Sequence, residues 1–377
     1  SFGTLVGIGG SIWLSMCLGQ KNEKRASQIL YNSFVMLVVL SICLTLGFIL
    51  LKHNLIYWFG GSDALYPYAN TYLTIYTLGT FFALMSIGLN YFITGQGYAT
   101  IAMLSVCIGA ITNIIFDFIL IRTLKIGVAG AAIGTVVAQF ISCMFVLCFL
   151  RFKSKIKLHK EELSIEKMKH IVKLGFSPFL IIASDSIILI VMNMMLQKYG
   201  GNMGDIYISA ITVAQSYFLL ITGPLLGISS GTQPIFAYHF GSQNLKKIKE
   251  AFKIVISFAF LFCLVMFIIS MCYSNVFVAM FTNDAMTMPI ADRAIKIFCL
   301  GILMMSIQYV LVDGITGLSN VKLSLFLSLN RKLMYLGCTC LLPAFLGVSN
   351  IFYAQPAADI YASIVTIICF IKIIPSY

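Results

Sequence analysis

The sequence has few charged residues. Only 10% of its 377 residues are Asp, Glu, Lys or Arg, and only 13 residues are acidic. Hydrophobic residues make up 60% of the chain and its mean hydropathy is +0.96, far outside the range of soluble globular proteins. This composition excludes a soluble domain and predicts a protein of the lipid bilayer.

The common signatures of catalysis are also missing. The sequence contains no HExxH zinc motif, no GxSxG nucleophile motif and no phosphate-binding loop. Its eleven cysteines lie in or beside apolar stretches, without CxxC spacing, and are interpreted as small buried hydrophobes. We therefore expect no enzymatic activity, no structural metal and no cofactor apart from a coupling ion.

Long apolar stretches recur along the whole chain. Roughly 20 helical residues cross a hydrocarbon core of ~30 Å, whereas the strands of a barrel show alternating segments of ~10 residues. The sequence therefore predicts an all-α integral membrane protein, a polytopic helical bundle. The predicted spans are 1–18, 29–52, 69–94, 99–123, 127–151, 171–197, 207–238, 251–274, 290–318, 322–346 and 349–374.

The net charge of +12 comes from basic residues in the connections between spans. Segments 19–27, 151–170 and 241–250 are the clearest examples, and an even number of spans separates them. The positive-inside rule places such segments on the cytoplasmic side. The charge therefore indicates membrane orientation, and no nucleic-acid partner is expected.

The two halves of the sequence are related by an internal repeat with an offset of 222 residues. IYTLG at 75–79 matches IFCLG at 297–301, and Gly127 matches Gly347 after a slip of two residues. Further matches pair Gly9, Gly19, Asn22, Lys24 and Arg25 with Gly231, Gly241, Asn244, Lys246 and Lys247. Six spans separate equivalent helices, so the halves form a parallel repeat of two pseudo-symmetric lobes related by an axis along the membrane normal.

The repeat predicts an amino-terminal lobe at 1–150, a basic cytoplasmic linker at 151–170 and a carboxyl-terminal lobe at 171–377. The helix at 171–197 would need a counterpart before Ser1. We therefore expect a complete protein to have twelve helices in two six-helix lobes, with the first helix and part of the second lacking from this sequence.

Asp117 is one of four carboxylates predicted within the spans, together with Asp185, Asp313 and Asp359. A charged Asp near the middle of a membrane costs about 2.5 to 3.5 kcal/mol on insertion scales. Asn113 and Asp117 are four residues apart, so they share one helical face and can jointly hold a proton or a sodium ion. Alternatively, Asp117 is hydrogen-bonded to a neighbouring helix or is partly neutralised by Arg122.

Several segments, in this order, resemble the multidrug and toxic compound extrusion (MATE) transporters. GIGGSIWLSMCLGQKNEKRA at 7–26 is similar to the second helix of that family, and GISSGTQPIFAYHFGSQN at 227–244 to its eighth. NIIFDFILI at 113–121 and GVAGAAIGT at 127–135 are similar to its fifth and sixth helices. The resemblance covers essentially the whole chain.

The resemblance to the DinF-like branch of the family implies a cation site in the amino-terminal lobe. It assigns Tyr72, Asn113, Asp117 and Thr135 to the site, whereas the first-helix aspartate of the family has no match in this sequence. Hydroxyl, amide and carboxylate oxygens suit a sodium ion or a proton-linked network.

The carboxyl-terminal lobe contains further candidates for a substrate site or a second ion site. Asp185 lies near an acidic position of other MATE branches, about one residue out of register, and Gln308 stands near another. Asp185 is expected to attract cationic drugs or to pair with Arg331, whose alternative role is that of a side chain snorkelling to the interface. Asp359 follows Pro356, which can free backbone carbonyls.

The resemblance implies a secondary antiporter that exports cationic or amphipathic compounds in exchange for protons or sodium ions by alternating access. We expect a monomeric multi-pass protein of a bacterial cell membrane. One alternative is a flippase for lipid-linked precursors from the same superfamily, for which a strongly cationic central cavity would be expected. The alternative from another class is a membrane-embedded enzyme, for which the sequence offers no clustered nucleophile or base.

Overall fold

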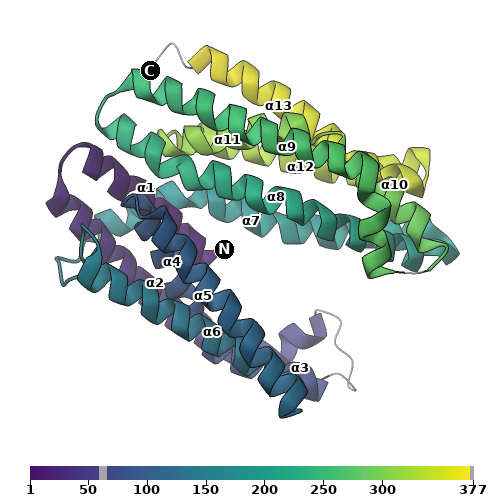
Figure 1. The fold of residues 1–377 in the computed structure, drawn as a ribbon, viewed down its shortest axis with the longest axis horizontal. Coiled ribbons are helices and arrows are strands. Elements are labelled where there is room, and N and C mark those ends of the chain that lie inside the picture. Colours follow the sequence, from purple (N-terminus) through teal and green to yellow (C-terminus); the bar gives the residue numbers. More distant parts are fainter. Residues whose placement is uncertain (59–65, 283, 374–377) are drawn as a thin grey trace. The chain divides into compact units, whose positions relative to one another are not determined.

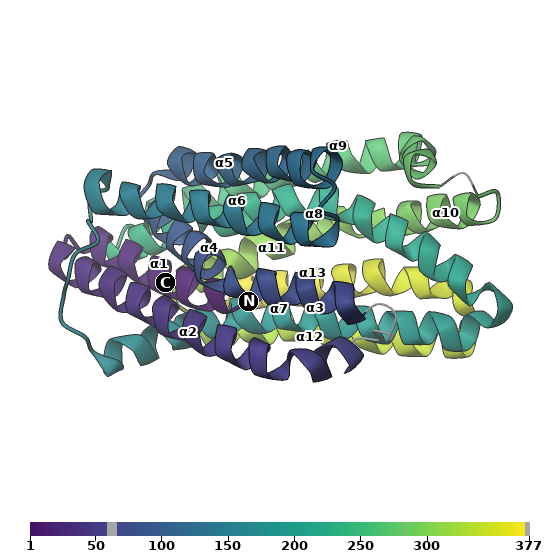
Figure 2. The same cartoon turned by 90° about the horizontal axis from the view of Figure 1, so that it is seen from below.

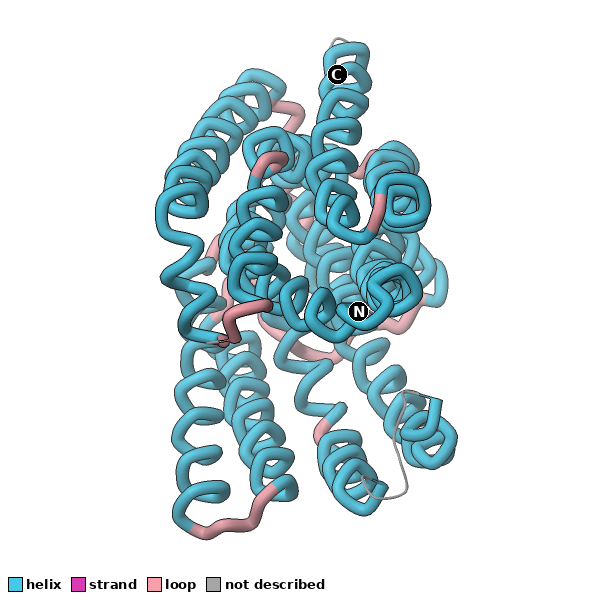
Figure 3. The backbone as a smooth tube through the Cα atoms, turned by 90° about the vertical axis from the view of Figure 1, so that its right-hand side faces the viewer, coloured by secondary structure: helices cyan, strands magenta, loops and turns pink. Residues whose placement is uncertain are grey.

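The computed structural model describes residues 1–58, 66–282 and 284–373. All regular structure within these ranges is helical, and Figure 3 shows the helices joined by short loops. A helix satisfies its backbone N–H and C=O groups within its own segment, as a lipid environment requires. The predicted all-α class is confirmed.

The chain divides into two compact units, residues 1–179 and 180–377. The helices of the first unit are α1 (Phe2–Gly19), α2 (Glu23–Trp58), α3 (Tyr66–Leu78), α4 (Thr80–Gly95), α5 (Ala99–Asp117), α6 (Val128–Cys148) and the start of α7 (Ile165–Gly200). Short π-helical segments, η1 (Phe118–Thr123) and η2 (Phe149–Lys153), extend α5 and α6. In Figure 1, α5 and α6 run side by side, in agreement with their extensive contacts.

α1 is the most deeply buried helix of the first unit. It packs against α2 and α4, and it contacts the start of α7 through two glycines. A side chain added at Gly9 would overlap the backbone of Ile171, and one added at Gly175 would overlap the backbone of Leu5. These glycines therefore let two helix backbones approach closely, as small residues do in membrane bundles.

The segment predicted as a linker at 151–170 lies within the first unit and is tied to its earlier helices. The Ile156 N–H donates to Gln96 Oε1 at 2.7 Å, and the Ser164 N–H donates to Asn32 Oδ1 at 2.9 Å. The side-chain amide of Asn32 also donates to a linker carbonyl. Polar side chains of α2 and of the residue that follows α4 therefore fix the path of the linker.

The second unit contains the remainder of α7 and a set of helices that parallels the first unit. These are η3 (Gly201–Met203), α8 (Gly204–Gly241), α9 (Leu245–Phe281), α10 (Thr287–Cys299), α11 (Ile302–Gly317), α12 (Val321–Leu346), η4 (Val348–Tyr353) and α13 (Ala354–Ile373). α8 packs on α9, α10 and α11, and α13 packs on α11 and α12. Figure 2 traces these helices from a second side.

Each unit has one bent helix pair, and the two bends occur at equivalent glycines. α3 and α4 are bent by 50° around Gly79, and α10 and α11 by 49° around Gly301. A Cβ at Gly79 would lie 2.5 Å from Val136 Cγ2, and a Cβ at Gly301 would lie 2.9 Å from Pro356 Cα. Any larger residue would force the neighbouring atoms to move. The predicted internal repeat is confirmed by the geometry within each unit.

The turns repeat as well. Equivalent turns place residues with positive φ at the same positions, namely Lys21 (58°) and Gln243 (55°), Gly97 (90°) and Ser319 (62°), and Gly127 (68°) and Gly347 (90°). Asn22 and Asn244 also cap the following helices alike, because their Oδ1 atoms accept hydrogen bonds from the N–H groups of Arg25 and Lys247. Conserved turn geometry keeps equivalent helices in register.

The number of spans differs from the sequence prediction. Within the described residues, eight helices are long and apolar enough to cross a membrane, or up to ten if each bent pair is one span. The predicted span 322–346 corresponds to α12, which is not among them and which carries Lys322, Arg331 and Lys332. Arg331 and Lys332 have carboxylate partners within the second unit, as described below.

Candidate functional site

Asn113 and Asp117 lie one turn apart on α5, and α6 covers them. Asn113 Nδ2 lies 3.5 Å from Thr135 Oγ1 at the limit of a hydrogen bond, and the Thr135 hydroxyl donates to the Ala131 carbonyl at 3.0 Å. An added Cβ at Gly134 would meet Asp117 Oδ1. Gly134 therefore lets the carboxylate approach the backbone of α6.

Asp117 is partly exposed as a residue, but one oxygen of its carboxylate is buried. Oδ1 is buried and has no hydrogen-bond partner among the described residues. The helix changes to π-helical hydrogen bonding directly after this residue, at Phe118–Thr123, a feature that is frequent at functional sites. A buried carboxylate oxygen without a donor can accept a proton or coordinate a cation.

The structure brings three of the four predicted cation ligands together. Tyr72 lies on α3, where its ring stacks on Tyr76 with centroids 5.8 Å apart. Within the described part of the chain, Tyr72 makes no hydrogen bond to Asn113, Asp117 or Thr135. The fourth predicted ligand is therefore not joined to the others by direct contact.

A cavity of about 480 Å³ adjoins this cluster inside the first unit. Asn113 and Thr135 line it together with Asn90, Gln139 and Gly109. Its polar lining consists of hydroxyl and amide groups, and Gln139 Oε1 is buried without a partner in the described structure. A cavity with apolar walls and a few neutral polar groups suits a small amphipathic molecule.

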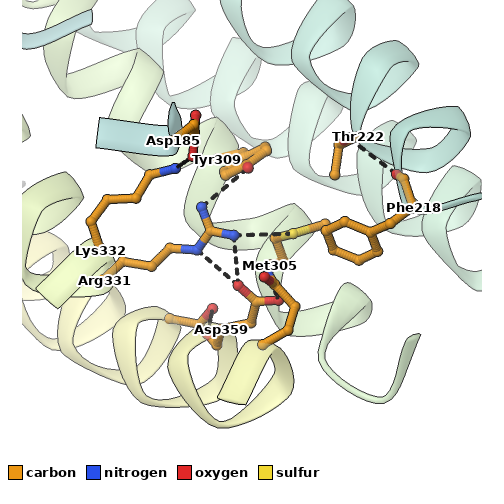
Figure 4. Close-up of polar contacts among 10 residues, drawn as sticks. Asp185, Phe218, Thr222, Met305, Tyr309, Arg331, Lys332 and Asp359 are labelled. Atoms are coloured by element: carbon orange, nitrogen blue, oxygen red, sulfur yellow. Dashed lines mark hydrogen bonds and ion pairs between the residues drawn. The ribbon is translucent and has the colours of Figure 1, made fainter. Parts of the chain in front are cut away.

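The second unit contains a buried ion pair between α12 and α13. Arg331 Nε and Nη2 both lie 2.8 Å from Asp359 Oδ1 (Figure 4). The other carboxylate oxygen accepts from Gln355 Nε2 at 2.9 Å. The Asp359 side chain is 0% exposed and that of Arg331 is 10% exposed. Arg331 therefore does not snorkel to the interface, because its partner lies inside the unit.

Tyr309 and Met305 of α11 complete this network. Arg331 Nη1 donates to the Tyr309 hydroxyl at 3.1 Å, and the guanidinium lies over the tyrosine ring at 5.1 Å. Nη2 also contacts the sulfur of Met305 at 3.7 Å. The guanidinium group of Arg331 on α12 therefore contacts residues of two other helices, α11 and α13, as Figure 4 shows.

Asp185 pairs with Lys332, so the predicted pairing with Arg331 is wrong. The side chain of Lys332 is 12% exposed and that of Asp185 is 59% exposed. Arg331 and Lys332 are neighbours on α12, and successive residues of a helix point about 100° apart. The rotation of α12 therefore decides which of the two cations faces α7.

Gln308 lies next to Tyr309 on α11 and is buried. Its side-chain oxygen has no hydrogen-bond partner in the described residues. Tyr309, Lys332 and Gln355 were not predicted as site residues. Gln355 could have been predicted from the sequence, because Gln355 and Asp359 in QPAAD have the same four-residue spacing as Asn113 and Asp117 in NIIFD.

Two helical units with a shared internal plan, each with a polar cluster among apolar helices, are typical of multi-pass membrane transporters. The family model MatE matches residues 1–119 and 182–334. The chain belongs to the MatE family. It is a multi-pass transporter of the cell membrane and not an enzyme.

Known proteins similar to this chain agree with that assignment. The multidrug export protein MepA of Staphylococcus haemolyticus is 24% identical over 367 residues, which cover 95% of this chain and 79% of the relative. MepA of Staphylococcus saprophyticus is 26% identical over 310 residues, with 81% and 68% covered.

Two solved structures share the fold. An outward-facing multidrug resistance MATE transporter has a TM-score of 0.93 at 22% identity, with 100% of this chain and 84% of the other covered. A transporter of the same superfamily from Pyrococcus furiosus has a TM-score of 0.94 at 21% identity, with the same coverage.

Proposed function

We propose that this chain exports cationic or amphipathic compounds in exchange for protons or sodium ions, by alternating access between its two lobes. Asp117 is the coupling residue of this proposal. The observation that carries it is the buried Oδ1 atom, which has no hydrogen-bond partner among the described residues and lies beside Asn113, Thr135 and the π-helical segment. The resemblance to the DinF-like branch implies the same residue, although Tyr72 is not in direct contact with the other three ligands.

The cavity of the first unit supports small amphipathic molecules as the substrate class. Its volume of about 480 Å³ falls in the range of drug-sized sites, and its polar lining is neutral. In the second unit we propose Asp185 as a counter-ion for cationic substrates, because its side chain is 59% exposed even though it pairs with Lys332, which a substrate cation can replace. The relatives named multidrug export proteins are consistent with this class.

The driving force is sufficient for export. One charge that moves down a membrane potential of 100 mV releases about 2.3 kcal/mol. This free energy supports a concentration ratio of roughly fiftyfold for a substrate exported per ion. We propose that a monomer performs this exchange without a bound cofactor.

The flippase alternative is not favoured by the second unit. Its central cations are committed to carboxylates, since Arg331 binds Asp359 and Lys332 binds Asp185. Such pairs leave little net positive charge to bind a diphosphate lipid.

The proposal is tested by Asp117→Asn in proteoliposomes. We expect the variant to keep dye binding but to lose uptake driven by an imposed proton or sodium gradient, because Asn cannot take up or release the coupling proton and is a poor sodium ligand. Asn113→Ala removes a neutral ligand and should weaken ion affinity about fivefold, a loss of ~1 kcal/mol.

Asp313→Asn is the matched control. Asp313 is also half-buried within a helix, but its Oδ1 accepts from Gln233 Nε2 at 2.7 Å, so an amide can keep this contact. It should retain coupling. If Asp117→Asn transports with wild-type coupling, Asp117 is not the coupling residue; if it transports normally but melts at lower temperature, it is a structural brace.

A further inference from the structure

A second cavity lies at the basic end of the first unit, apart from the proposed ion site. Its volume is about 320 Å³, and it forms where α1, α2 and the start of α7 meet. Its walls include Trp13 of α1, Arg25 of α2 and the α7 residues Lys167, Lys169, Glu166, His170 and Lys173. The proposed transport mechanism does not use these residues.

Trp13 forms the apolar wall of this cavity, and two basic side chains cover its ring. Trp13 is 7% exposed. The ring of His170 lies 4.4 Å from it between centroids, and the Arg25 guanidinium lies 5.1 Å from the indole centroid. These contacts hold side chains from α1, α2 and α7 together at the wall of the cavity.

The backbone that carries the basic residues is also fixed. The Gly9 and Gly175 contacts hold the first turns of α7 against α1. Lys167 Nζ donates to Gln28 Oε1 at 2.6 Å, which joins α7 to α2. The cationic groups therefore converge through tertiary packing and not only through their closeness in sequence.

The residues that line this cavity carry an excess of positive charge. Four permanent cations line it against one carboxylate, that of Glu166. Among the described residues, Arg25, Lys169 and Lys173 form no ion pair, whereas the nearby Lys155 binds Glu23 at 2.9 Å. Like charges that converge in a concave site repel one another, and a bound anion removes this repulsion.

We propose that this cavity binds a phosphate group. Lysines supply compact charges, and the arginine fork matches phosphate oxygens in two-point hydrogen bonding. The Ser164 hydroxyl, which also lines the cavity, adds a neutral donor. The phosphate is that of an anionic phospholipid headgroup of the cytoplasmic leaflet or a soluble phosphate.

Trp13 provides the readout. A Trp58→Phe background leaves Trp13 as the single tryptophan, because the chain has two. The protein is placed in nanodiscs of phosphatidylcholine with increasing phosphatidylglycerol, and the Trp13 emission is recorded. In a second arm, inorganic phosphate is titrated into pure phosphatidylcholine nanodiscs at constant ionic strength.

Lys169→Gln with Lys173→Gln is the test variant, and Lys246→Gln with Lys249→Gln is the control. Both pairs are exposed basic residues near the start of a helix, but the control pair lies outside the cavity. We expect the phosphate-dependent change in emission to need at least about tenfold more ligand in the test variant and to stay unchanged in the control. Arg25→Gln should weaken it as well, from a different helix.

A response to phosphatidylglycerol alone identifies a lipid headgroup, and a response to inorganic phosphate identifies a soluble ligand. No response in either arm, or an equal loss in the test and control variants, overturns the proposal. All variants must elute and melt as the Trp58→Phe parent does. If the lysine pair alters the fold, the Arg25→Gln result decides.

Discussion

The two units place different chemistry at equivalent positions. Arg331 on α12 corresponds to Gly109 on α5 with the repeat offset of 222, and Asp359 on α13 corresponds to Gln139 on α6 with the slipped offset of 220. In the second unit the two residues form a buried ion pair. In the first unit the glycine and the amide line a cavity of about 480 Å³.

The structure confirms that this register is correct. Gly79 meets Val136 in the first unit, and Gly301 meets Pro356 in the second, so the same two offsets relate both sides of each contact. A duplicated scaffold has therefore kept its bends and turns while one half opened a neutral cavity and the other filled the same place with charges. The ion pair ties α12 to α13 in the second unit, whereas the equivalent place in the first unit is open to a ligand.

The largest effect is expected when the ion pair of the second unit is broken. Asp359→Asn should destabilise the protein by about 3 to 5 kcal/mol, because Arg331 is left as a buried charge without a counter-ion. Equilibrium unfolding of the purified protein in mixed detergent micelles measures this loss.

The double variant Arg331→Met with Asp359→Asn is the control for that measurement. It should recover most of the lost stability, because no buried charge remains unpaired. A stable Asp359→Asn single variant would show that the second unit does not depend on the pair, and the proposed contrast between the units would be lost.

A smaller difference is expected at the equivalent bends. Gly301→Ala would bring Cβ within 2.9 Å of the Pro356 backbone, whereas Gly79→Ala would meet the methyl groups of the Val136 side chain. Backbone yields less readily than a side chain, so Gly301→Ala should cost about 1 to 3 kcal/mol and Gly79→Ala less. Thermal melting of the two variants measures the order. Equal losses would mean that Val136 has no room to move.

Much of this architecture follows from the sequence because the repeat and the apolar periodicity are local signals. The match of Gly79 with Gly301 revealed the repeat, although the bends at these glycines were not predicted, and the spacing of Asn113 and Asp117 placed both on one face. Neither signal depends on how distant helices pack.

The partners of the buried charges could not be predicted in the same way. Arg331 and Asp359 are 28 residues apart on different helices, and their contact depends on the rotation of α12 and on the 3-10 turns of η4 before α13. The alternative that paired Asp185 with Arg331 was wrong for the same reason. If α12 were rotated by about 100° around its axis, Arg331 would take the place of Lys332. The hydrophobicity pattern does not fix this rotation.

The smallest effect on stability is expected for a substitution in the cavity of the first unit. Gly109 lines the cavity, and a Cβ there would sit 3.4 Å from Ser142 Cβ, an ordinary contact distance. Gly109→Leu should therefore be accommodated while its side chain occupies part of the cavity. We expect affinity for a cationic dye such as ethidium to fall about tenfold, equivalent to ~1.4 kcal/mol, with little change in stability. Fluorescence titration of the purified protein measures the affinity, and Gly47→Leu on α2, where an added Cβ meets nothing within 4 Å, is the control. Unchanged dye affinity in Gly109→Leu would show that the dye binds elsewhere. The cavity of the first unit would then not be the substrate site, despite its contrast with the filled position in the second unit.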